Sequence, residues 1–303
     1  MKGTLRKEIN KHKIYYLLLL IPIIYYIVFH YIPMGGIILA FKDYSFFKGF
    51  NKSPWVGFHW FEYLFTAPGF MRSLKNTILI SLYTLIFTFP APVILALMLN
   101  ECEQLKFKKI VQTVSYLPHF LSWSIITGLI VILLSPSVGI VNKFLELIGM
   151  ESIYFMAEPK YTRSLFVVSK IWKEMGWGSI IYLAAITGIN PEQYEAAMID
   201  GASKLRQAWH ITIPGISNLI IMMLVFNSAG LINVGFEQAY NLVISPTYET
   251  GQVISTYVYS KGVQEMKYSF GTAVGLAQSL VSISLLAAAN TIAKHFSEDG
   301  AVW

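Results

Sequence analysis

Long apolar runs, separated by shorter polar stretches, dominate the pattern of this chain. Five runs contain no Asp, Glu, Lys or Arg, and a sixth, Leu165–Ile189, is apolar except for Lys170, Lys173 and Glu174; the five are Ile14–Phe41, Asn76–Asn100, Ile110–Leu134, Ile211–Phe236 and Tyr268–Ala293. Each is long enough to cross about 30 Å of hydrocarbon as a helix. None alternates with a period of two, and a helix satisfies its own backbone in lipid. The pattern predicts an all-α integral membrane protein with six transmembrane helices.

The composition agrees with a membrane location. Charged residues make up 13% of the 303 residues and hydrophobic residues 55%, whereas soluble domains carry about 25% charge. The net charge of +6 does not form a basic stripe, because most Lys and Arg residues lie between the apolar runs. Nucleic-acid binding is therefore not predicted. A single cysteine, Cys102, excludes an intramolecular disulfide.

Positive charges in the short loops predict the orientation. The loops on one side carry most of them: Lys2, Arg6, Lys7, Lys11 and Lys13, then Lys106, Lys108 and Lys109, then Lys204 and Arg206, and finally Lys294. The positive-inside rule places these loops in the cytoplasm, although the opposite loops are not free of Lys and Arg. We expect both termini to be cytoplasmic, with residues 1–13 forming an N-terminal segment and 14–303 a single transmembrane domain. The basic amino end also resembles a secretory signal, but its apolar run is too long and no cleavage site follows, so we interpret it as an uncleaved first span.

The loop at about 190–210 carries strong helix signals. Asn190 can cap a helix that Pro191 begins, and Glu192 lies near its positive end. Gly201 interrupts the segment, and Ser203 can cap a second short helix. The residues alone predict a stiff elbow with a small-residue surface on the cytoplasmic side.

The same loop resembles a family signature. Glu195, Ala196 and Ala197 are followed by Asp200 and Gly201, and then by Ile211, Ile213 and Pro214. This spacing is similar to the EAA motif of permease subunits of binding-protein-dependent ABC importers, with Ile213 in place of leucine. The resemblance implies that this elbow, at about 190–210, is the coupling helix, which docks in a cleft of an ATPase subunit, where Glu195 reaches a basic partner. The alternative is a plain amphipathic connector.

Three further segments resemble the maltose-permease-like branch of that family. They are Pro33–Phe58, Ser115–Ile126 and Phe236–Gly262, and the second is similar to a subgroup that serves oligosaccharides from polysaccharide breakdown. The resemblance implies an oligosaccharide as cargo. A permease for another solute, such as a glycerophosphodiester or an osmolyte, is the alternative.

Candidates for the substrate cavity lie in the charged fourth span. Lys170, Lys173, Glu174 and Trp177 share one side of a helix by their spacing. Charges within a span face a bundle interior or a wet cavity, and an aromatic ring can stack on the apolar face of a sugar. In the fifth span Asn227 and Asn233 are further candidates. The alternative is a Lys170–Glu174 pair that only neutralises itself. Histidines 30, 59 and 119 are expected to be structural or interface residues.

No catalytic or nucleotide-binding motif is visible. The chain lacks a GxxxxGK[ST] phosphate loop, an HExxH and a GxSxG sequence, so we expect no cofactor in this chain, with ATP and Mg²⁺ bound by a partner ATPase. The resemblance implies a second, similar permease as heterodimer partner, two ATPase subunits, an extracytoplasmic sugar-binding protein and a multi-pass location in the bacterial cytoplasmic membrane. A passive channel or a membrane enzyme is the alternative from another class.

Overall fold

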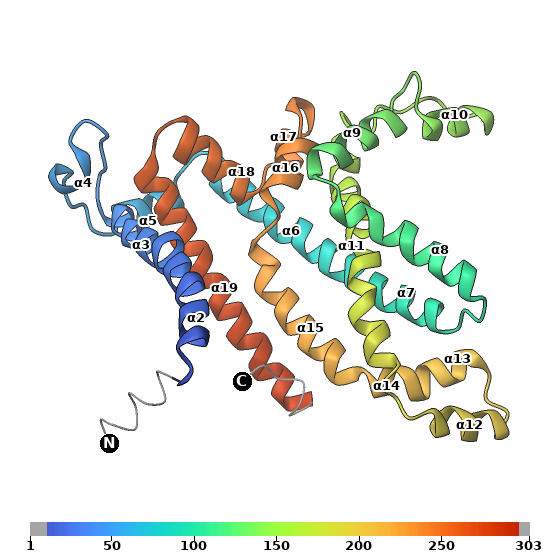
Figure 1. Ribbon diagram of the computed structural model, residues 1–303. Helices are drawn as coiled ribbons and strands as arrows, with labels where there is room; N and C mark the ends of the chain where they lie inside the picture. The colour runs from blue at the N-terminus through green and yellow to red at the C-terminus, as the bar shows by residue number, and fades with distance from the viewer. Residues whose placement is uncertain (1–10, 297–303) are drawn as a thin grey trace. The chain divides into compact units, whose positions relative to one another are not determined.

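The computed structural model describes residues 11–296, and these form two compact units (Figure 1). One unit comprises residues 11–66 and 259–277, and the other comprises 67–258 and 278–296. Within the described part the only strand-like pairing is an isolated bridge between Lys42 and Trp55, so the predicted all-α class is confirmed. Most of the predicted segment 1–13 lies outside the described residues.

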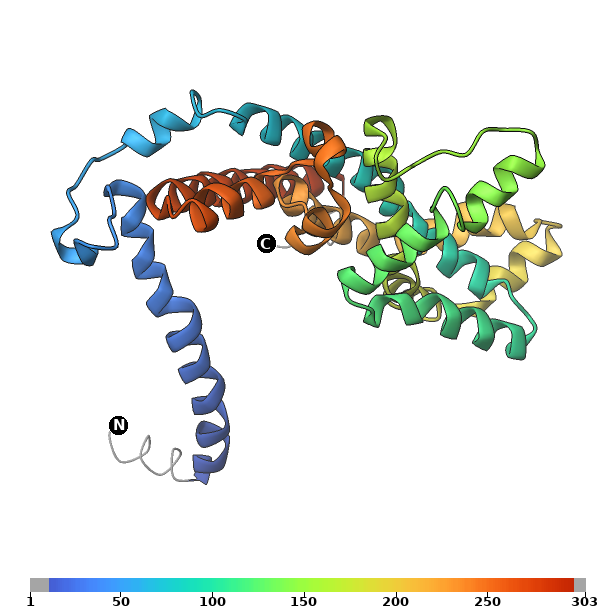
Figure 2. The same cartoon turned by 90° about the horizontal axis from the view of Figure 1, so that it is seen from above.

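The first unit begins with one continuous apolar helix, shown in blue in Figure 2. It is built from α2 (Lys13–Tyr26), η1 (Ile27–Tyr31), α3 (Ile32–Met34) and η2 (Gly35–Phe41). The π-helical turn η1 precedes Pro33, which has no amide hydrogen to donate. The unit continues with α4 (Gly49–Lys52) and α5 (His59–Leu64), then η8 (Tyr259–Gln264) and the start of α19 (Tyr268–Phe296).

Aromatic packing holds α5 against the start of α19 in this unit. The rings of Trp60 and Tyr63 lie 6.2 and 5.5 Å from that of Phe270. The indole of Trp60 also donates to the carbonyl of Lys42 over 2.9 Å, and the hydroxyl of Ser269 accepts from the amide of Tyr44. At η8, Lys261 and Lys267 both donate to the Glu265 carboxylate and lower its pKa.

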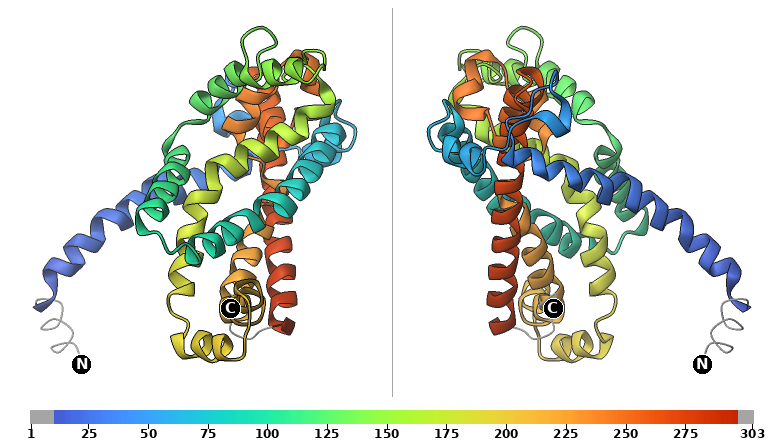
Figure 3. Two further views of the ribbon diagram at one scale, coloured as in Figure 1. Left: turned by 90° about the vertical axis from the view of Figure 1, so that its right-hand side faces the viewer. Right: turned by 90° about the vertical axis from the view of Figure 1, so that its left-hand side faces the viewer.

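The second unit is organised around the 25-residue helix α11 (Thr162–Ile186). Packed against it are α6 (Phe70–Thr88), α7 (Pro90–Asn100) and α8 (Leu105–Tyr116), and also η3 (Leu117–Phe120). At one end of α11 lie α9 (Trp123–Leu133) and α10 (Ile140–Leu147), and at the opposite end lies an elbow of two short helices, α12 (Pro191–Ile199) and α13 (Lys204–Gln207) (Figures 1 and 3). The remaining elements are η4 (Pro159–Tyr161), η5 (Ala208–Thr212), α14 (Ile213–Gly215), α15 (Ser217–Ala229), η6 (Gly230–Ile232), α16 (Phe236–Leu242), η7 (Ser245–Thr247), α17 (Tyr248–Gly251), α18 (Ile254–Val258) and the rest of α19.

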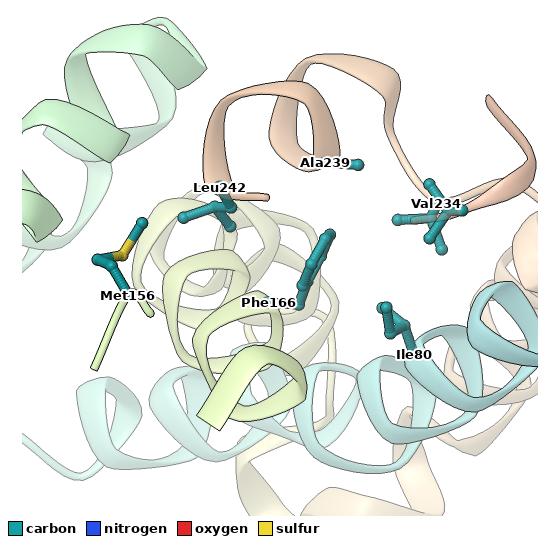
Figure 4. Packing of buried hydrophobic residues seen from close by; sticks show 7 residues of the cluster. Ile80, Met156, Phe166, Val234, Ala239 and Leu242 are labelled. Atoms are coloured by element: carbon teal, nitrogen blue, oxygen red, sulfur yellow. The ribbon is translucent and has the colours of Figure 1, made fainter. Parts of the chain in front are cut away.

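Two apolar clusters fix these helices to α11. In one, Phe166 of α11 lies between Ile80 of α6 and Leu242 of α16 (Figure 4); Met156, Val234, Ala239 and Val253 complete it. In the other, Tyr182 and Ile186 of α11 pack with Val93 and Ala96 of α7 and with Ile216. Burying a large apolar side chain contributes about 1.5–3 kcal/mol relative to exposure, so both ends of α11 are held.

Two of the predicted spans are bent rather than continuous. Residues Leu105–Phe120 and Trp123–Leu133 meet at 111°, and Lys204–Gly215 meets Ser217–Ile232 at 65°. The first break follows Pro118, and the hydroxyl of Ser122 accepts from the amide of Ile125 to begin α9. The second break follows Pro214. Three described helices are long and apolar enough to cross a membrane, or five if each bent pair is one span. Helix α11 adds the charged segment around Lys170.

Candidate functional site

The elbow between α11 and α14 begins and turns as its sequence predicts. The side-chain oxygen of Asn190 accepts from the amide of Glu192 over 3.1 Å, at the start of α12. Gly201 adopts a left-handed conformation with φ of +74°, which lets the chain reverse. The hydroxyl of Ser203 then accepts from the amide of Arg206 and begins α13.

Three polar contacts hold the elbow in place. Tyr194 and Thr212 share a hydrogen bond of 3.0 Å between their hydroxyls, and the buried amide of Gln207 donates to the carbonyl of Ala202. The ammonium of Lys204 lies 3.2 Å from a carboxylate oxygen of Glu101, which follows α7. The elbow is therefore connected to the end of α7 as well as to the chain on either side of it.

The outer surface of the elbow is open. The predicted docking residues Glu195, Ala196, Asp200 and Gly201 are exposed, and Ala197 is half-buried. Large apolar side chains adjoin them: Met198, Ile199 and Leu205 are 54%, 87% and 70% exposed. The sequence analysis did not single out these three. A methionine and an isoleucine directly after the Ala-Ala pair, in a loop predicted to face the cytoplasm, were the available signal.

A cavity of about 420 Å³ lies beside the middle of α11. Helices α6, α7 and α11 line one part of it, together with His119 of η3, and residues from α15 to α16 line the rest. Five of the six predicted cavity residues line it, namely Lys170, Glu174, Trp177, Asn227 and Asn233. The cavity therefore brings together side chains that are far apart in the sequence.

The wall of the cavity combines apolar side chains with the charged groups of Lys170 and Glu174. Among the described residues, neither side chain takes part in an ion pair, so the self-neutralising Lys170–Glu174 pair is not formed in this structure. Two further lining residues, Thr88 and His119, each have a buried polar atom without a hydrogen-bond partner in the described part of the chain. The charged groups of Lys170 and Glu174 and the amides of Asn227 and Asn233 give the cavity groups that can bind a polar ligand.

Trp177 contributes an aromatic face. Its ring and the imidazole of His119 are parallel within 2° with centroids 4.6 Å apart, and Phe120 meets it edge-on at 5.4 Å. The side chain of Trp177 remains 46% exposed. His119 was expected to be structural, and this stack gives it a structural contact while it also lines the cavity.

The structure gives Lys173 partners different from those expected. It is not among the cavity-lining residues. Its ammonium donates to the carbonyls of His119, over 2.8 Å, and Leu121, and it lies 5.6 Å from the centre of the Trp123 ring. Because successive helical residues are about 100° apart, Lys173 lies about 60° around α11 from Lys170. That offset directs it to the bend between η3 and α9.

Residues suited to holding a metal are not grouped here: within residues 11–296 there is no cluster of three or more His, Cys, Asp or Glu side chains.

Two amide side chains at the cavity wall are held by hydrogen bonds to backbone carbonyls. Asn227 donates to the carbonyl of Met223 one turn earlier, and the buried amide of Gln238 donates to the carbonyl of Phe166. These bonds fix polar side chains at the cavity wall.

Comparison with known proteins places the fold and the elbow in one family. Residues 107–298 match the family described as binding-protein-dependent transport system inner membrane component. The chain is 42% identical to protein LplB of Bacillus subtilis over 96% of its own length and 92% of that protein. It is also 42% identical to the polygalacturonan/rhamnogalacturonan transport system permease protein YteP of the same organism, over 97% and 91% of the two chains.

Solved structures agree with these relatives. A chain of a bacterial ABC transporter involved in the import of the acidic polysaccharide alginate is 41% identical, with a TM-score of 0.89 over 97% of this chain and 99% of that chain. A chain from the alginate transporter in complex with its alginate pentasaccharide-bound periplasmic protein gives a TM-score of 0.87 at 41% identity, over 96% and 97%. The protein belongs to the binding-protein-dependent transport system inner membrane components, the permease subunits of ABC importers.

Proposed function

We propose that this permease carries an oligosaccharide, and specifically one that contains acidic sugars, through the cavity beside α11. The observation that supports the proposal most directly is the meeting of Trp177, Lys170, Glu174, Asn227 and Asn233 around one cavity. Ligand sites commonly measure about 300–1,000 Å³, and the 420 Å³ found here is within that range. An aromatic face with amide and charged groups around it matches the mixed chemistry of a sugar ring.

The cargo's charge is inferred from Lys170 together with the relatives. A lysine ammonium that is not ion-paired in a span carries a large desolvation cost, about 2.5–3.5 kcal/mol on insertion scales. A carboxylate on the cargo would offset that cost. Polygalacturonan and alginate, which the names of two relatives mention, are built from acidic sugars. Glu174 would then accept hydrogen bonds from sugar hydroxyls.

The proposal includes the assembly and its orientation. A second permease, two ATPase subunits that bind ATP and Mg²⁺, and an extracytoplasmic binding protein would complete the importer. The elbow surface around Glu195 and Ala197 would dock on one ATPase, with Met198 and Ile199 adding apolar contact. Both termini and the elbow would face the cytoplasm, as the Lys and Arg distribution predicts.

Uptake by the purified complex in lipid vesicles tests the function. We expect ATP-dependent uptake of galacturonate or mannuronate oligosaccharides to exceed that of neutral oligosaccharides of equal length. Trp177→Ala should raise the half-saturating concentration at least about tenfold, the equivalent of 1.4 kcal/mol, because the stacking face is removed. Trp172→Ala is the matched control, since Trp172 lies on the same helix outside the cavity lining.

Lys170→Met separates the two interpretations of this lysine. If Lys170 contacts the cargo, the complex assembles and loses its preference for acidic over neutral sugars. If it instead has a role in assembly, the complex is recovered in lower yield with the preference retained. Uptake that is indifferent to Trp177→Ala, or no uptake of any oligosaccharide by the unaltered complex, would refute the proposed function.

A further inference from the structure

We infer that Lys173 and His119 together form a support that fixes the ring of Trp177 for substrate, with Lys173 acting as a positioning residue. The inference rests on the proposed function of the cavity but concerns how Trp177 is held in place rather than how it contacts the cargo. It assigns to Lys173, a charged residue within a span, the role of holding the bend between η3 and α9 in place.

The first step is the bend between η3 and α9. A helix end leaves carbonyls without intrahelical partners, and here the chain turns through 111° directly after them. The ammonium of Lys173 donates to the carbonyls of His119 and Leu121 on the two sides of Phe120. An ammonium carries three hydrogens, so one lysine can satisfy several carbonyls at once. Through these hydrogen bonds Lys173 holds the end of η3 against α11.

The second step is the close approach of the two helices one turn further along. A Cβ atom on Gly176 would lie 2.0 Å from the carbonyl oxygen of Ser115, which is far inside a normal contact. Only glycine allows the backbone of α8 to approach α11 this closely. Gly176 and Lys173 are three residues apart, so they hold adjacent parts of the α8–η3 segment against the same side of α11.

The third step is the placement of His119. The backbone carbonyl of this residue is bonded to Lys173, and its ring is stacked on Trp177. One face of the indole is thereby covered and its tilt is fixed, while the side chain stays 46% exposed next to the cavity. A platform that is already ordered loses less conformational entropy when a ligand binds. His119 thus supports the ring from one face, while part of Trp177 stays open next to the cavity.

The experiment reads the Trp177 ring directly and transport separately. The complete complex is labelled with 5-fluorotryptophan, and the Trp177 signal is identified by its loss in Trp177→Phe. We expect His119→Ala and Lys173→Met to move this ¹⁹F signal in the same direction, since the first removes the stacked imidazole and the second releases the backbone that holds it against Trp177. Lys173→Arg keeps the donors and should leave the signal near its original position. Lys109→Met, on an exposed lysine of α8, is the control for loss of a positive charge.

Transport supplies the second readout. The half-saturating concentration should rise about 2- to 13-fold in His119→Ala and in Lys173→Met, the equivalent of roughly 0.5–1.5 kcal/mol for an aromatic stack. The maximal rate per assembled complex should change less. The double variant should have a half-saturating concentration no higher than that of the more impaired single variant. A Trp177 signal that responds to His119→Ala but not to Lys173→Met would overturn the anchoring role of Lys173. A half-saturating concentration that falls in His119→Ala would show that the histidine competes with the cargo. If the unaltered complex imports no oligosaccharide, the proposed function fails while the ¹⁹F result still decides the support.

Discussion

Replacing Gly176 with alanine tests how closely α8 must approach α11. The new Cβ would lie 2.0 Å from the Ser115 oxygen, 2.3 Å from its carbonyl carbon and 2.9 Å from the amide nitrogen of Tyr116. All three are backbone atoms, so no side chain can rotate to make room. An ordinary contact begins at 3.4 Å, and the two helices would therefore have to separate by about 1.4 Å or the helix would have to deform.

The cost of this change has a defined size. Inserting one methyl group into a well-packed site costs about 1–3 kcal/mol, and the helix propensity of alanine returns about 1 kcal/mol of that at most. We expect the purified complex with Gly176→Ala to lose thermal stability. The separation would also move Ser115 and η3 away from α11. The hydrogen bonds from Lys173 to the carbonyls of η3 would then break, and the half-saturating concentration of the oligosaccharide should rise.

Gly128→Ala is the matched control because it also replaces a glycine inside a helix, here α9. No atom lies within 4 Å of a Cβ built at Gly128, so this variant should be as stable as the unaltered protein or slightly more stable. Both variants are compared by thermal melting in one detergent and by uptake in vesicles. A Gly176→Ala complex that melts with Gly128→Ala and transports normally would refute the close packing of α8 on α11.

Two further predictions concern the elbow and the orientation. Ala197→Arg should abolish sugar-stimulated ATP hydrolysis by the complex while the chain still inserts in the membrane, because a long charged side chain prevents close docking; normal transport with Ala197→Arg would exclude Ala197 from the docking surface. Cys102, the only cysteine, should react with a membrane-impermeant thiol reagent only after the membrane is opened, as detected by mass shift; labelling in intact cells would reverse the predicted orientation.

The sequence predicts the helices well and their breaks less well. Apolar runs without charges determine where helices form, because lipid leaves no other partner for the backbone. The caps at Asn190 and Ser203 were also predictable, since both act on amides within three residues. The 111° bend after Phe120 was not predicted, because Pro118 and Ser122 indicate only a local interruption. The carbonyls at the bend are bonded by Lys173, which is more than fifty residues away in the sequence.

The candidate site shows the same limit. Spacing along α11 places Lys170, Glu174 and Trp177 on one side of the helix, and the structure has all three at the cavity. The same spacing included Lys173, yet a helical pattern does not show which other segment of the chain packs against each residue of that side. His119 could not be connected to Trp177 from the sequence, because nothing in it brings the third and fourth spans together at that position.

Asn142 orders the segment between α9 and η4 through hydrogen bonds, and this order affects how a protein could bind there. This side chain is 1% exposed, and its amide nitrogen donates to the carbonyls of Leu134, Ser135 and Ile153, while its oxygen accepts from the amide of Ile153. The two ends of the segment are thus joined through one residue, and α10 presents Phe144 and Leu147, 63% and 84% exposed. Ordering a free backbone costs about 1–2 kcal/mol per residue. Because folding has already ordered these residues, binding of a protein on α10 would not have to order this backbone, and that part of the entropic cost of association is removed.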